Sequence, residues 1–273
     1  MRCFILKKRR INRKKRMHKE LFHIYGPLAI NSFGLMIIIG LVVFSALFLS
    51  DPKRAKLIGT DDYFNALSLG ILVGIIGGRA LFVITNLDTF SHWTEIFEFW
   101  MGGFSLLGGL LALVIALPLY LHKKRVNIIA LLDLAAVYAP LLQAISRIGC
   151  FFAGCCYGIP TTCTFGVINP HYSHSMAVHP TQLYSAGALF IIFLLMYVIF
   201  QKLCTKPGQL LCIYLIVMCI ERFTIDFWRA DPQFFSSNWL TAFSIPQWIA
   251  LAIALLATMV LIFLPTWQRR SLS

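Results

Sequence analysis

Seven long apolar runs separated by short polar segments dominate the pattern of hydrophobic and polar positions along the chain. Each run is close to the length of about 20 residues with which an α-helix crosses the hydrocarbon core of a bilayer. The runs cover approximately residues 27–49, 66–85, 99–121, 128–148, 180–200, 209–228 and 246–264. The pattern therefore predicts an all-α polytopic membrane protein with about seven transmembrane helices.

Composition supports this class. Of the 273 residues, 59% are hydrophobic and 13% are charged, whereas soluble domains average about 25% charged residues. An ordinary soluble domain is therefore excluded. The longest segments predicted to lie outside the membrane on the outer side, approximately 149–179 and 229–245, are rich in Gly, Pro, Ser and aromatic residues. We expect them to form small cap elements on the periplasmic side.

The loops alternate in charge, which predicts an orientation. The loop "NLDTFSHWTE" after the second run has no Lys or Arg. Basic residues follow the first, third, fifth and seventh runs: Lys53, Arg54, Lys56, Lys123, Lys124, Arg125, Lys202, Lys206, Arg269 and Arg270. The positive-inside rule places basic loops in the cytoplasm. We therefore expect a periplasmic amino terminus and a cytoplasmic carboxyl terminus.

The amino-terminal segment conflicts with that orientation. Ten of the 24 Lys and Arg residues lie within residues 1–19, a density typical of segments that bind anionic lipid or nucleic acid. Two alternatives remain open: a tail that binds the outer membrane surface, or a translation start at Met17. Residues 20–273 are predicted to form one transmembrane domain, and no nucleic-acid partner is expected.

Charged residues within the apolar runs mark the candidate site, because a charge inside the bilayer costs at least about 2.5 kcal/mol. Arg79 and Arg147 are two of them. The sixth run ends in "ERFTIDFWR", which places Arg222, Asp226 and Arg229 on one helical face. One interpretation is a structural set of ion pairs centred on Asp226. The other is a site for a lipid phosphate, which guanidinium groups bind through paired hydrogen bonds.

Four cysteines follow Arg147 closely in "SRIGCFFAGCCYG" and its continuation: Cys150, Cys155, Cys156 and Cys163. Thiolates bind zinc, but the spacing lacks a C-x2-C pair, so the sequence assigns no metal ligands. A disulfide in an oxidising compartment and small packed thiols are the other interpretations. None of the three is excluded by the pattern.

Two further segments carry candidate binding residues. The glycines of "GGFSLLGGLL", among them Gly103 and Gly108, can let helices pack closely or let backbone N–H groups approach a ligand. The segment "HPTQLYSAGALF" opens the fifth run and brings His179, Gln182 and Tyr184 to the membrane boundary. Their side chains can donate and accept hydrogen bonds there.

From about Tyr25 to its carboxyl terminus the chain resembles the bacterial prolipoprotein diacylglyceryl transferase family. The resemblance rests on six segments in order: "YGPLAINSFGLM", "GGRALFV", "GGFSLLGG", "SRIGCFFAGCCYG", "HPTQLY" and "ERFTIDFWR". It implies an inner-membrane enzyme that moves the diacylglyceryl group of phosphatidylglycerol, a membrane lipid, onto the lipobox cysteine of a prolipoprotein signal peptide. A monomer without a cofactor is implied as well.

The resemblance also implies roles for individual residues. Arg147 and Arg222 match the two arginines on which the family relies most, and Arg229 and Gly158 match family residues too. Asp226 stands where many members have Glu. Arginines could stabilise both an attacking thiolate and a departing glycerol phosphate, and a dry cavity that binds both substrates would supply proximity.

The chain departs from the family pattern at several positions. Leu107 stands where members of the family have a histidine or a tyrosine, and Phe33 replaces a tyrosine. Cys150 and Cys155 stand where Asn and Glu are frequent, and Ser185 replaces a Glu. Two alternatives to an active transferase therefore stay open: a non-catalytic paralogue that binds anionic lipid or lipoprotein precursors, and a membrane protein that uses its cysteines for thiol–disulfide exchange or metal handling.

Overall fold

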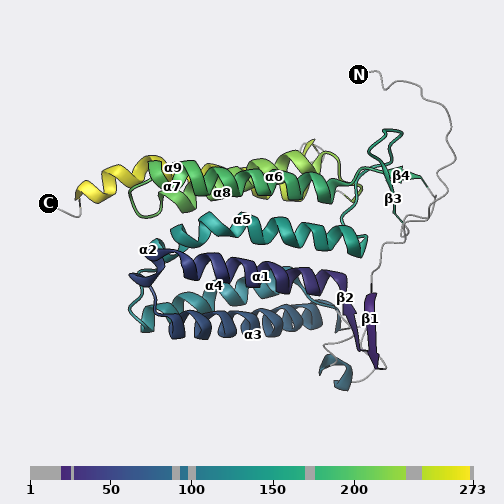
Figure 1. Ribbon diagram of the computed structural model, residues 1–273, viewed down its shortest axis with the longest axis horizontal. Helices are drawn as coiled ribbons and strands as arrows, with labels where there is room; N and C mark the ends of the chain where they lie inside the picture. The colour runs from purple at the N-terminus through teal and green to yellow at the C-terminus, as the bar shows by residue number, and fades with distance from the viewer. Residues whose placement is uncertain are drawn as a thin grey trace. The chain divides into compact units, whose positions relative to one another are not determined.

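The computed structural model describes residues 20–25, 28–87, 93–97, 103–169, 176–231 and 242–270, and it is mostly helical (Figure 1). The long helices are α1 (Ser32–Ser50), α3 (Thr60–Thr85), α4 (Leu106–Lys123), α5 (Ile128–Ala153), α6 (Thr181–Leu195), α8 (Gln209–Asp226) and α9 (Ile245–Arg270). Short elements are the helices α2 (Pro52–Ala55) and α7 (Gln201–Leu203), the 3-10 turn η2 (Trp93–Phe97) and the π-helical segment η4 (Met196–Phe200). Two pairs of strands complete the described part: β1 (Glu20–Tyr25) with β2 (Leu28–Asn31), and β3 (Val167–Ile168) with β4 (Ala177–Val178).

The all-α polytopic class is confirmed. Within the described residues, five helices are long and apolar enough to cross a bilayer: α1, α3, α5, α9 and the continuous segment from α6 through α7. A sixth, α4, is a shorter apolar helix. The remaining long helix, α8, carries Glu221, Arg222 and Asp226 near its end, so its crossing of the membrane stays a prediction.

Two predicted helix starts lie several residues too early, each for a local reason, whereas α3 begins at Thr60, before the predicted start near residue 66. The first helix begins at Ser32 rather than near residue 27, because Leu28–Asn31 pairs as strand β2. Helix α4 begins at Leu106, where the Ser105 hydroxyl caps it by accepting a hydrogen bond from the Gly108 N–H at 3.4 Å. A serine in this position satisfies a backbone donor that the first helical turn leaves without an intrahelical partner.

The chain divides into two compact units. Among the described residues, the first unit contains the start of α1 and everything from residue 136 onward, and the second contains residues 46–135. The second unit is built on α3 and α4, which pack side by side (Figure 1). A Cβ at Gly108 would meet the Gly77 carbonyl oxygen at 2.4 Å, and one at Gly77 would meet Ala112 Cβ at 2.4 Å. Glycine is therefore what allows these two helices to approach each other so closely.

Arg79 in the second unit fastens a loop rather than facing lipid. Its side chain is buried, and its guanidinium donates from Nε to the Ile96 carbonyl at 3.0 Å and from Nη1 to the Gly103 carbonyl at 3.1 Å. Gly103 adopts φ +77°, a left-handed conformation that favours glycine. These contacts pair the buried cation with backbone oxygens, which explains how a charge is tolerated within α3.

In the first unit, α8 packs against α9 and also contacts α6 (Figure 1). Beyond the end of α5, β3 pairs antiparallel with β4, with Val167 opposite Val178. These two short strands lie within the segment between residues 149 and 179 that is predicted to form a cap. The first unit thus holds Arg147, Arg222, Asp226, Arg229 and the cysteine cluster.

Candidate functional site

Arg147, Arg222 and Arg229 of the first unit differ in how completely the described residues pair them. Arg229 forms two hydrogen bonds with Asp231, from Nε to Oδ1 at 3.1 Å and from Nη2 to Oδ2 at 2.9 Å. Arg222 forms an ion pair with one of the described residues, Asp226, from Nη2 to Oδ1 at 3.2 Å, and 30% of its side chain is exposed. No hydrogen bond or ion pair joins the Arg147 guanidinium to any of the described residues, although Arg147 lies within electrostatic range of Arg222. Arg147 and Arg222 therefore keep donors available to a ligand.

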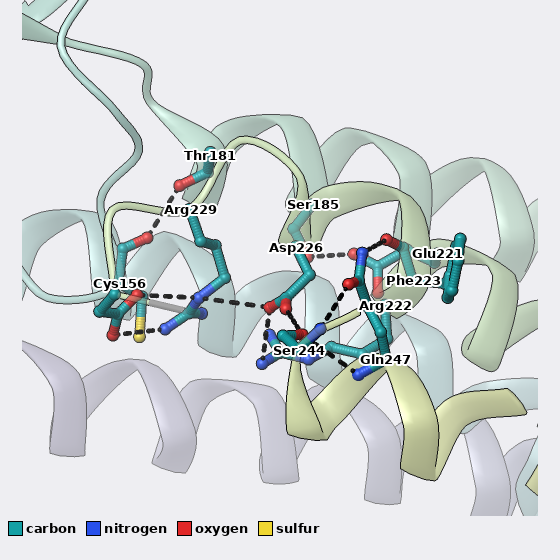
Figure 2. A network of polar contacts seen from close by, with 11 residues as sticks. Cys156, Thr181, Ser185, Glu221, Arg222, Phe223, Asp226, Arg229, Ser244 and Gln247 are labelled. Atoms are coloured by element: carbon teal, nitrogen blue, oxygen red, sulfur yellow. Dashed lines mark hydrogen bonds and ion pairs between the residues drawn. The ribbon is translucent and has the colours of Figure 1, made fainter. Parts of the chain in front are cut away.

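Asp226 is the centre of a buried polar network (Figure 2). Its side chain is 2% exposed, and its Oδ1 lies 3.2 Å from Arg222 Nη2 and 3.8 Å from Arg229 Nε. Its other oxygen, Oδ2, accepts a hydrogen bond from the Ser244 hydroxyl. The carboxylate thus offsets part of the charge of two arginines and fixes one side of the Arg222 guanidinium.

The start of α9 holds Ser244 in place through reciprocal capping contacts. The Ser244 N–H donates to Gln247 Oε1 at 2.9 Å, and the Gln247 N–H donates to Ser244 Oγ at 3.3 Å. The Gln247 side-chain amide also donates to the Phe223 carbonyl of α8 at 3.1 Å. Sequence reasoning missed both residues, although "SIPQ" has the S-x-x-Q spacing of a capping box and could have found them.

Replacement of Asp226 by Asn should destabilise the protein, because two arginines would lose their shared buried counter-charge. We expect a loss of about 3 kcal/mol in the free energy of unfolding, the low end of the range for breaking a buried ion pair. Titration of the detergent-solubilised protein with a denaturing detergent measures it.

Asp231→Asn is the matched control for that experiment. The Asp231 side chain is 63% exposed, so its removal should cost less than about 1 kcal/mol. Equal losses in the two variants would contradict the central place of Asp226 in the network.

Gly158 joins three segments next to the arginines. Its N–H donates to the His179 carbonyl at 2.9 Å, and the neighbouring Ile159 N–H donates to the Trp228 carbonyl at 2.9 Å. Gly158 also forms a backbone bridge with Arg229. A Cβ at this position would meet Trp228 O at 2.6 Å and His179 O at 2.8 Å. Only glycine fits, so the end of α8 and the residue before α6 are held together at this point.

The first turn of α6 holds the backbone that follows α5. Thr181 Oγ1 donates to the Cys156 carbonyl at 2.8 Å, and Gln182 Nε2 donates to the Cys155 carbonyl at 2.6 Å. The Asn169 side chain holds the preceding carbonyl, that of Gly154, at 2.9 Å. Three consecutive carbonyls are thus fixed by side chains, of which sequence reasoning singled out Gln182 alone. Gln182 Oε1 is buried and receives no hydrogen bond from the described residues, which makes it an available acceptor.

His179 and Tyr184 form a second pair on the same helix start. His179 Nδ1 lies 3.3 Å from the Tyr184 hydroxyl, within hydrogen-bond distance, and the two rings are 6.1 Å apart between centroids. Both side chains are at least partly exposed. The sequence placed these two residues at the membrane boundary, and the structure joins them.

Cys150, Cys155 and Cys156 come together at the end of α5. Their three Sγ atoms all lie within 4.8 Å of one another, and none is in a disulfide. Hydrogen bonds with the Cys150 and Cys155 thiols lower the pKa of the Cys156 thiol, and the neighbouring Arg229 guanidinium lowers it further. The spacing in the sequence gave only a weak signal for this group, since the turn at residues 154–156 creates it.

Comparison with known proteins assigns the chain to a family. The sequence profile described as prolipoprotein diacylglyceryl transferase matches residues 19–263. The chain belongs to this family. A phosphatidylglycerol–prolipoprotein diacylglyceryl transferase of Clostridium tetani is 35% identical over 224 residues, which are 80% of this chain and 87% of that protein. A Clostridium perfringens protein named phosphatidylglycerol–prolipoprotein diacylglyceryl transferase 2 is 36% identical over 225 residues, which are 80% of this chain and 85% of that protein. The Bordetella parapertussis protein of that name is 29% identical over 84% and 89%.

The structure also locates the positions at which this member of the transferase family departs from the family pattern. Phe33 lies in the first turn of α1, where a Cβ on Gly149 of α5 would meet its Cα at 3.4 Å. Leu107 lies in the first turn of α4 with its side chain 59% exposed. Ser185, in place of the family Glu, donates a hydrogen bond to the buried Glu221 of α8. The carboxylate of Glu221, which belongs to a different helix, therefore lies next to Ser185. Sequence reasoning did not single out Glu221.

One further polar contact ties together the two transferase helices that carry the arginines. Gln143 Nε2 of α5 donates to the Tyr214 hydroxyl of α8 at 2.7 Å. Gln143 lies one helical turn before Arg147, on the same face. The contact links α5 to α8, the two helices that carry Arg147 and Arg222.

Gly103 and Gly108, predicted to bind substrate, have packing roles in the second unit. Gly103 lies against the Phe82 ring and accepts a hydrogen bond from Arg79. Gly108 faces Gly77 across the α3–α4 contact. These contacts account for glycine at both positions, and a role in substrate binding stays a prediction.

Proposed function

We propose that this protein transfers the diacylglyceryl group of phosphatidylglycerol to the lipobox cysteine of prolipoprotein signal peptides, with formation of a thioether. The environment of Arg147 is the observation that supports the proposal most strongly. It is a permanent cation at the end of a membrane-spanning helix, it has no ion-pair partner among the described residues, and it lies near the incompletely paired Arg222. A lipid phosphate supplies the anion that such a pair of guanidinium groups binds.

The arrangement suits displacement at a glycerol carbon. The substrate thiolate attacks the carbon that carries the phosphate ester, a C–S bond forms, and the C–O bond breaks with its electron pair on the departing glycerol phosphate. Arg147 and Arg222 stabilise the charge that gathers on the leaving phosphate, which is electrostatic catalysis by preorganised donors. Arg229, paired with Asp231 and Asp226, holds the end of α8 in position.

The neighbouring segment offers groups for the signal peptide. Gln182 Oε1 is a buried acceptor to which no described donor is bound, and a backbone N–H of an extended peptide is the group that it would bind. His179 and Tyr184 lie on the same helix start as further polar contacts. The family context and the loop charges support an enzyme of the bacterial inner membrane whose site faces the periplasm, and we expect it to act as a monomer.

Purified protein incubated with phosphatidylglycerol and a lipobox peptide should add the mass of one diacylglyceryl group to the peptide. A peptide with Ser in place of the lipobox Cys is the control, and it should gain no mass, because the thiol is the nucleophile. Binding of the lipid or the peptide without any gain of mass would support the non-catalytic paralogue instead. The departures from the family pattern at Leu107 and Phe33 are the reason for testing this non-catalytic alternative.

A further inference from the structure

The three-thiol cluster of Cys150, Cys155 and Cys156 is not used by the arginine chemistry. Ligands of one tetrahedral zinc ion, at Zn–S bonds of about 2.3 Å, lie about 3.8 Å apart. The three Sγ atoms already lie within 4.8 Å of one another. The described part of the chain adds no fourth His, Cys, Asp or Glu to this group.

The backbone holds the cluster in a conformation that packing alone does not require. Cys156 has φ +60°, a left-handed value that few residues other than glycine adopt. The hydrogen bonds of Thr181 and Gln182 to the Cys156 and Cys155 carbonyls maintain it. Unfavourable backbone conformations that the surroundings enforce are concentrated at functional sites. Here the conformation turns the third thiol back toward the other two.

Burial and charge also distinguish the cluster from packed thiols. Cys150 is buried, but Cys156 is partly exposed and Cys155 is exposed, so an ion could reach the sulfurs. Arg147 lies near the Cys150 thiol and Arg229 near the Cys156 thiol. Two permanent positive charges beside the thiols would offset the negative charge of a three-thiolate zinc site.

We propose that Cys150, Cys155 and Cys156 bind one zinc ion and leave its fourth coordination position to the lipobox thiol of the substrate. This inference rests on the proposed transferase function and adds the means by which the nucleophile is activated. Three protein ligands and one open position are typical of catalytic zinc. A thiol that binds the ion loses its proton, which passes to water.

A zinc ion in this position would supply the anionic sulfur that displacement at the glycerol carbon requires. The sulfur held there would attack the glycerol carbon while the C–O bond breaks with its electron pair on the glycerol phosphate, whose charge Arg147 and Arg222 would stabilise. The resulting thioether is a weaker zinc ligand than a thiolate, which favours release of the product.

Cobalt substitution tests the site without relying on transfer. Full-length protein is purified in detergent, reduced, stripped of metal and loaded with Co²⁺, whose sulfur charge-transfer and d–d absorption bands report thiolate ligands. We expect about one ion per chain and tetrahedral bands. Addition of the lipobox peptide should shift the d–d bands, while the peptide with Ser in place of Cys should not. Wild-type protein should also purify with about one zinc ion.

The variant C150S/C155S/C156S should bind neither ion and should lose at least about 100-fold in transfer rate, the effect typical of losing the activation of a nucleophile. The matched control is Cys204→Ser, which should behave as wild type. Cys204 directly follows α7, at the end of the continuous helical segment Thr181–Leu203 opposite to the start of α6. An absence of thiolate bands in the wild type, bands that do not respond to the peptide thiol, or full transfer by metal-free protein would each overturn the proposal. Metal binding and the peptide response without transfer would instead overturn the proposed function and leave the site standing.

Discussion

Replacement of Arg147 by alanine should lower the rate of diacylglyceryl transfer by at least about 100-fold, the loss typical of one donor that stabilises charge in a transition state. Arg222→Ala should have an effect of the same size. Transfer of the lipid group to a lipobox peptide, followed by mass, measures both. The physical reason is that each guanidinium stabilises the leaving phosphate at a site where few other cations are available.

The two arginine variants should differ in stability, which separates a catalytic from a structural role. Arg147 has no ion pair with the described residues, so Arg147→Ala should leave the melting temperature unchanged. Arg222→Ala leaves Asp226 with Arg229 and Ser244 as partners and should destabilise the protein modestly. Arg147→Lys should recover only part of the activity, because an ammonium group cannot bind phosphate in the bidentate manner of guanidinium.

Lys123→Ala is the charge-matched control for the arginine variants. Lys123 is an exposed residue in the last turn of α4, and its removal should change neither rate nor stability. Wild-type transfer by Arg147→Ala or by Arg222→Ala would show that the lipid phosphate is bound elsewhere.

Replacement of Gly158 by alanine should abolish activity although it adds a single methyl group. The new Cβ would lie 2.6 Å from the Trp228 carbonyl oxygen, 2.7 Å from His179 Cβ and 2.8 Å from the His179 carbonyl oxygen. Two of these three atoms belong to the backbone and cannot move aside by a change of rotamer. We expect a loss of about 1–3 kcal/mol in stability. A displacement of about 1 Å at the end of α8 is enough for a 100-fold loss in rate.

Gly187→Ala is the matched control for that substitution. Gly187 lies within α6, and a Cβ there meets nothing within 4 Å. Alanine should therefore raise stability by about 0.5–1 kcal/mol through its higher helix propensity and leave transfer intact. Thermal unfolding and the mass assay on both variants make the comparison. Equal behaviour of the two glycine variants would remove Gly158 from the junction that positions the arginines.

Much of the fold follows from the sequence because membrane helices are encoded locally. In lipid, an apolar run must satisfy its backbone N–H and C=O groups with hydrogen bonds inside the run itself, which a helix does. Hydropathy alone therefore locates α1, α3, α5, α6 and α9. Helix α8 was also predicted, although its three charged residues weaken its apolar signal. Boundaries were less certain, because β2 and the Ser105 cap shorten the first and third helices.

The candidate site was predictable in part. The spacing of Arg222, Asp226 and Arg229 placed them on one face, and the structure joins all three through the Asp226 carboxylate. The sequence left open whether they form structural ion pairs or an anion site. The structure divides them: Arg229 is bound twice to Asp231, whereas Arg222 keeps an exposed side and Arg147 is unpaired within the described residues.

What the sequence by itself determined is the class of the protein, its family resemblance and the arginines that belong to it. Tertiary structure alone decided which groups meet: Ser244 with Asp226, Ser185 with Glu221, Gln143 with Tyr214, and the three thiols with one another. The physical reason is that helix formation depends on neighbours along the chain, whereas each of these contacts depends on a helix rotation or a turn that only packing sets. The left-handed turn at Cys156 is the clearest example, since nothing in a pair of adjacent cysteines predicts that both thiols will face the same point.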